Sequence, residues 1–110
     1  MPVTNVDNSS PQLPKWTNIP NGNTGSAWQM PPFRTAFFQA FGTFGVGGSV
    51  QLEGSNDGLN WGKLSPAALT AAGVFASLAN NEAPKYIRPN VTAGDGTTSI
   101  TVVGFAQENR

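Results

Sequence analysis

Apolar and polar residues alternate along much of the second half of the chain, which is the pattern of half-buried β-strands. In residues 49–54, Val50 and Leu52 alternate with polar side chains and are expected to point inward. Residues 85–92 repeat this pattern, and residues 97–106 are rich in the β-branched side chains that strands favour. The pattern therefore predicts three strands in this half of the chain.

Short segments rich in glycine and Asx residues separate these strands. The sequence SNDG at 55–58 is typical of a tight turn, because Asn, Asp and Gly tolerate positive φ. Residues 61–64 are predicted to return beside residues 49–54 as the second strand of a hairpin. Pro89 lacks a backbone donor and predicts an edge strand or a bulge. Residues 65–73 are compatible with either one or two helical turns or a loop with a short strand, and residues 74–78 are predicted to be a strand.

Residues 34–46 (RTAFFQAFGTFGV) form a further predicted strand that is apolar on both faces. Alternation places one set of residues on or near one face: Ala36, Phe38, Ala40, Phe44 and Val46. It places the other set on the opposite face: Phe37, Gln39, Phe41 and Thr43. Such a strand is either buried between two layers of its own domain or packed against another subunit. In the second case Phe37 and Phe41 lie at the subunit interface. Six or so short strands predict an all-β fold, an antiparallel β-sandwich of jelly-roll-like or Ig-like connectivity.

The first 32 residues have a different character. They contain six of the nine prolines, and proline favours extended backbone. They are also not charge-rich and carry tryptophan and aliphatic residues, which disordered tails usually lack. We therefore expect residues 1–32 to form an extended N-terminal arm beside a β-sandwich domain of residues 33–110, with a free tail as the alternative. The apolar side chains expected to anchor this arm on a partner are Leu13, Trp16, Ile19 and Trp28.

The charge content argues against electrostatic recognition. The chain has 110 residues, 6 Lys+Arg and 6 Asp+Glu, so its formal net charge is zero and no basic stripe for nucleic acid is present. Charged residues make up 11%, against roughly 25% in an average domain. Such a surface is expected either to be covered by neighbouring molecules or to lie outside the cytosol. A body this small is also marginal alone, which favours oligomerisation.

The sequence offers little for catalysis. It contains no cysteine and no histidine, so it has no disulfide, no thiolate metal site and no imidazole base. Glu53 and Asp57 are expected on a strand face and in a turn, where they need not converge. No apolar run approaches the ~20 residues of a membrane-spanning helix. We expect no enzyme activity, no cofactor, no metal, no small-molecule substrate, no nucleic acid and no membrane.

Two longer strings resemble known proteins. The sequence GGSVQLEGSNDGLNWGKLS and the later APKYIRPNVTAGDGTTSITVV resemble small bacteriophage virion proteins over about residues 48–104. The shared features are a V-x-x-E-G-S-N-D-G-x-N-W hairpin, a Y-I-R-P segment and a G-D-G-T-T-S turn. These proteins resemble capsid decoration, or cement, proteins, which are small β-sandwich modules that bind the outside of the phage head. The resemblance does not cover the N-terminal arm.

The resemblance implies a structural role on the outer capsid surface of a virion, with the chain made in the host cytoplasm. The expected partners are the major capsid protein and further copies of this chain, as a homotrimer. Two alternatives stay open. Hairpins of this type also occur in carbohydrate-binding or host-attachment modules, in which Trp61 and Tyr86 would form the sugar platform. The chain could also be a tail or head–tail connector component.

Overall fold

The computed structural model describes residues 13–29, 34–64, 68–75 and 84–108, and these form a β-structure throughout. The prediction of an all-β fold is confirmed. Its strands are β1 (Lys15–Ile19), β2 (Trp28–Gln29), β3 (Arg34–Thr43), β4 (Ser49–Ser55), β5 (Gly62–Lys63), β6 (Gly73–Val74), β7 (Tyr86–Ala93) and β8 (Ser99–Glu108).

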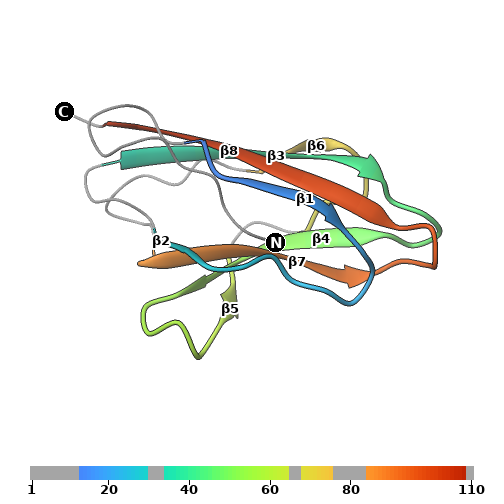
Figure 1. Ribbon diagram of the computed structural model, residues 1–110, viewed down its shortest axis with the longest axis horizontal. Coiled ribbons are helices and arrows are strands. Elements are labelled where there is room, and N and C mark those ends of the chain that lie inside the picture. The colour runs from blue at the N-terminus through green and yellow to red at the C-terminus, as the bar shows by residue number, and fades with distance from the viewer. Residues whose placement is uncertain (1–12, 30–33, 65–67, 76–83, 109–110) are drawn as a thin grey trace.

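The strands form two four-stranded antiparallel sheets that pack face to face (Figure 1). Sheet A has the order β1-β8-β3-β6, and sheet B has the order β2-β7-β4-β5. The first half of the chain pairs with the second half in reverse order, as in one long hairpin. Its antiparallel pairs are β1–β8, β2–β7, β3–β6 and β4–β5. Rolling this hairpin brings β3 against β8 and β4 against β7. This connectivity is that of an eight-stranded jelly roll, so the jelly-roll alternative is the correct one.

The hydrophobic core lies between the sheets and is centred on Phe38. The ring centroid of Trp16 lies 6.2 Å from that of Phe38, and Trp28 packs edge-on at 6.0 Å. Gly104 faces Phe38 across the β3–β8 pair and leaves room for its ring, because a Cβ there would lie 2.6 Å from Phe38 Cε2. Both tryptophans come from the segment before β3, so that segment completes the core.

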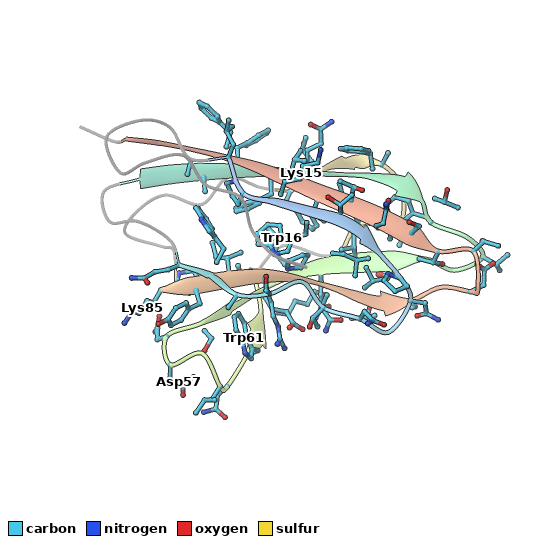
Figure 2. All side chains as sticks on the ribbon, viewed as in Figure 1. Lys15, Trp16, Asp57, Trp61 and Lys85 are labelled. Atoms are coloured by element: carbon cyan, nitrogen blue, oxygen red, sulfur yellow. The ribbon has the colours of Figure 1, made fainter. Side chains whose placement is uncertain are left out.

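The arm prediction is therefore wrong for residues 13–29. Trp16 and Ile19 are 0% exposed and Trp28 is 1% exposed, because β1 and β2 pair with β8 and β7 as members of the sheets. Trp16 also donates a hydrogen bond from Nε1 to the Ser26 carbonyl at 2.8 Å. Figure 2 shows Trp16 pointing between the two sheets. Residues 1–12 and 30–32 of the predicted arm lie outside the described residues.

The predicted facing is confirmed within β3, but the strand predicted at 34–46 ends at Thr43, and Val46, which alternation places on the same face as Phe38, is 81% exposed. Ala36, Phe38 and Ala40 are buried, whereas Phe37 and Phe41 are exposed.

Of the two alternatives for residues 85–92, the edge strand is wrong, because β7 lies between β2 and β4. The β4–β7 pair does contain an irregularity, but it lies between Val91 and Ala93 and not at Pro89. The carbonyl of Pro89 accepts a hydrogen bond from Gly25 N–H. The missing donor of Pro89 therefore faces an irregular segment beyond the short strand β2, and not β4.

Residues 68–72 are a loop with an isolated β-bridge at Leu69, and not a helix, and β6 begins at Gly73. Leu69 exchanges two backbone hydrogen bonds with Val50, at 2.8 and 2.9 Å, and so extends the pairing of β4. Of the remaining residues in the ambiguous segment, 65–67 lie outside the described residues. β6 includes Val74, the first residue of the strand predicted at 74–78. Residues 76–78 of that predicted strand lie outside the described part of the chain.

The connections between β3 and β4 and between β7 and β8 are tied together by Asp95. Its carboxylate accepts hydrogen bonds from Val46 N–H at 2.9 Å and from the N–H and hydroxyl of Thr97 at 2.9 and 2.6 Å. The Thr97 hydroxyl, followed by the backbone N–H groups of Val46 and Thr97, lowers the pKa of Asp95 to about 2. Asp95 is therefore ionised at neutral pH and holds two loops that cross between the sheets.

Candidate interaction surfaces

The outer surface of sheet A carries large apolar side chains. Phe37 on β3 lies directly opposite Phe105 on β8, and these residues are 46% and 42% exposed. Phe41 and Val74 continue the same apolar surface along β3 and β6. We call the set Leu13, Phe37, Phe41, Val74 and Phe105 the outer apolar face. Several half-exposed aromatic and aliphatic residues on one sheet are typical of a surface that another protein covers.

A groove of about 370 Å³ opens at one end of this face. Its walls are largely apolar, and Lys15 is its one charged side chain among the described residues. The lining residues are Leu13, Pro14, Lys15, Phe37, Gln39, Val103, Gly104 and Phe105. The groove therefore suits an uncharged partner segment better than a charged one.

The outer surface of sheet B is polar and is organised around Glu53. Glu53 lies opposite Arg88 in the β4–β7 pair, and Arg88 Nε donates to Glu53 Oε1 at 2.9 Å. The second oxygen, Oε2, accepts hydrogen bonds from Gln51 Nε2 and Asn90 Nδ2, both at 2.8 Å. Burial raises the pKa of Glu53, but the hydrogen bonds from Asn90, Gln51 and Arg88 outweigh it and leave the pKa below its usual range. Glu53 is therefore a buried, ionised carboxylate with several donors.

Two aromatic rings flank this network. The Arg88 guanidinium carbon lies 4.2 Å from the centroid of the Trp61 ring, and Lys85 Nζ lies 5.4 Å from that of Tyr86. Figure 2 shows Trp61 and Lys85 on the outer side of sheet B. The structure thus brings both predicted platform residues to one side of the molecule. Arg88, however, occupies one face of the Trp61 indole.

Asp57 belongs to the turn between β4 and β5. Its Oδ1 accepts hydrogen bonds from the N–H groups of Leu59 and Asn60 at 2.8 and 2.9 Å, and its Oδ2 accepts one from Asn60 Nδ2. The N–H groups of Asn60 and then Leu59 hold the pKa of Asp57 well below its usual range. Asp57 and Glu53 therefore bind separate sets of donors, and Asp57 acts as a turn former.

The predicted partner-binding residues fall into two groups. Leu13, Phe37 and Phe41 are exposed on the outer apolar face, whereas Trp16, Ile19 and Trp28 are buried in the chain's own core and cannot anchor it on a partner. Sequence reasoning did not single out Phe105. Its apolar character was visible in the sequence, but its place opposite Phe37 depends on the register of β3 with β8.

Arg88 is a second surface residue that the sequence interpretation did not single out. The Y-I-R-P string contains it, but its alignment with Glu53 and Trp61 follows from the pairing of β4 with both β7 and β5. Each of the three residues comes from a different segment. The sequence carries no local signal for this cluster.

Comparison with models of known protein families finds no match for this chain, and comparison with curated proteins likewise finds no relative. Within the described ranges, no helix is long and apolar enough to cross a membrane. The same part of the chain contains no group of three or more His, Cys, Asp or Glu residues that could hold a metal ion.

Proposed function

We propose that this chain is a non-enzymatic virion protein that binds the outer surface of a phage capsid and stabilises contacts between major capsid protein subunits. The observation that carries the proposal is the outer apolar face. Three phenylalanines on this one small sheet are 40–46% exposed. Covering their apolar surface with another protein is favoured in free energy over leaving it in contact with water. The resemblance of the SNDGLNW hairpin and the following segments to cement proteins supplies the capsid as partner.

The fold is compatible with this proposal, since jelly rolls occur in viral coat proteins, although they also occur in lectins. In the proposed assembly, copies of the chain associate through the outer apolar face, as a trimer. Each trimer then presents three equivalent sheet B surfaces to a repeating lattice. Weak contacts repeated three times combine into firm attachment by avidity.

Binding to capsids is tested by co-sedimentation. Purified chain is mixed with purified expanded capsids of the phage that encodes it, and the pellet is analysed for bound chain. We expect saturation at a fixed number of copies per capsid, and at most a modest effect of raising salt from about 0.1 to 0.5 M, because charged residues are few. Absence of the chain from the pellet at every concentration would overturn the proposal.

The role of the outer apolar face is tested by sedimentation velocity. Phe37→Asp places a charge beside Phe105 and is expected to convert the oligomer into monomers. Leu59→Asp is the matched control, because Leu59 is 83% exposed but lies in the β4–β5 turn. An oligomer that persists in Phe37→Asp would show that the face does not mediate self-association. Glycan-array binding that is lost in Trp61→Ala would instead favour the carbohydrate-binding alternative.

A further inference from the structure

The guanidinium of Arg88 is held in place from two directions. Its Nε donates to Glu53 at 2.9 Å, and its central carbon lies over the Trp61 ring, 4.2 Å from the ring centroid. Glu53 is itself fixed by Gln51 and Asn90. An arginine side chain normally loses much rotamer freedom when it binds a ligand. Here a large part of that freedom is already lost in the free protein.

This arrangement leaves the other end of the guanidinium unused. Among the described residues, the Nη1 and Nη2 groups of Arg88 have no hydrogen-bond acceptor, and the side chain is 25% exposed. No buried side-chain nitrogen or oxygen in this part of the protein lacks a partner, so the two Nη groups are open to solvent. Together they form a planar fork whose spacing matches the two oxygens of a carboxylate.

The charges around the fork favour a ligand with one negative charge. Arg88 and Glu53 cancel each other, and the exposed Lys63 lies opposite Glu53 in the β4–β5 pair. These three groups carry a net single positive charge. A phosphate, with almost two negative charges at neutral pH, is a poorer match than a carboxylate.

The surroundings favour a protein carboxylate over a sugar. Recognition of a saccharide needs free hydrogen-bonding groups for its hydroxyls and an open aromatic face. On this surface the Gln51 and Asn90 amides already donate to Glu53, and Arg88 covers one face of Trp61. We propose that Arg88, backed by Glu53 and Trp61, is a preorganised site for the carboxylate of an Asp or Glu side chain on a partner protein. If the proposed function holds, that partner is the capsid, but the site itself does not depend on it.

The site is tested by NMR with free probes. The Nε–H signal of Arg88 is identified by its loss in Arg88→Lys, and it is followed together with the Trp61 indole N–H during titration with acetate and with poly-L-glutamate. We expect saturable shifts of both signals, and binding of poly-L-glutamate at a lower carboxylate concentration because neighbouring carboxylates rebind. Arg88→Lys keeps the charge beside Glu53 but removes the fork, so it should weaken binding about tenfold or more.

Controls separate the site from general charge attraction and from misfolding. Lys15→Gln removes a cation from the opposite sheet and should leave the affinity unchanged. The spectrum of Arg88→Lys away from sheet B reports whether the variant is folded. Three results would each overturn the inference: no saturable shift, equal affinity of folded Arg88→Lys, or tighter binding of phosphate or polygalacturonate than of poly-L-glutamate. All probes are free in solution, so carboxylate binding at Arg88 is measured independently of the capsid. Failure of the chain to bind capsids would not contradict the proposed carboxylate site.

Discussion

Truncation of Trp16 tests whether the first strand belongs to the sandwich. Trp16 is 0% exposed, packs on Phe38 and donates a hydrogen bond to the Ser26 carbonyl. Burial of ~200 Å² of tryptophan surface at ~25 cal/mol per Å² corresponds to ~5 kcal/mol. Measured losses for Trp→Ala in cores are about 3–5 kcal/mol. A domain of this size has a total stability of about 5–15 kcal/mol, so Trp16→Ala should remove a large fraction of it.

The assay is urea unfolding followed by far-UV circular dichroism, which does not depend on the tryptophan that is removed. With a slope of ~1.5 kcal/mol/M, a loss of ~4 kcal/mol lowers the midpoint by about 2.7 M. Leu13→Ala is the matched control, since Leu13 is close in sequence but 49% exposed, and its cost should be below about 1 kcal/mol.

The comparison between the two variants decides the matter. If Trp16→Ala shifts the midpoint no more than Leu13→Ala does, residues 13–29 are not packed into the sandwich in solution. That result would support the original prediction that this segment belongs to an extended N-terminal arm. If Trp16→Ala is too unstable to purify, Trp16→Phe retains the ring and should show an intermediate midpoint.

Two further predictions concern the loops and the β3–β8 pair. The pKa of Asp95 is about 2 in the folded chain against an ordinary value of 3.8, so its stabilisation is present above pH 4 and is lost as the pH falls toward 2. Asp95→Asn should therefore flatten the fall of the urea midpoint between pH 4 and 2, and an unchanged slope would contradict this. Gly104→Ala places a methyl 2.6 Å from Phe38 Cε2 and should cost about 1–3 kcal/mol. Gly96→Ala, which meets nothing within 4 Å, is its control and should change the melting temperature little.

The sequence predicted the strands best where alternation is regular. β4 and β7 have the expected inward residues, because successive side chains of a strand point to opposite faces whatever the strand pairs with. The turn at 55–58 follows from Asn, Asp and Gly for an equally local reason. The facing of Phe37 and Phe38 was predictable in the same way, although which side faced solvent was not.

Prediction failed where the structure depends on distant segments. The six prolines before β3 suggested an arm, but Pro14 is fully buried and its carbonyl accepts a hydrogen bond from Gly104 N–H at 2.7 Å. Pro89 suggested an edge, but the irregular segment around Gly25 lies beside it. Pro89 lacks its donor on the side of an irregular segment, and Pro14 lacks its donor just before β1 begins, so neither proline interrupts the middle of a regular ladder.

Local sequence and tertiary structure therefore determined different features of this protein. The sequence by itself determined the class of fold, the turns and the alternation within single strands, because these depend on neighbours one to four residues apart. The tertiary structure decided that β1 pairs with β8, that Phe105 joins Phe37 on the outer face, and that Arg88 lies between Glu53 and Trp61. These juxtapositions arise when the two sheets close over the core, since only the pairing of distant strands sets which side chains become neighbours.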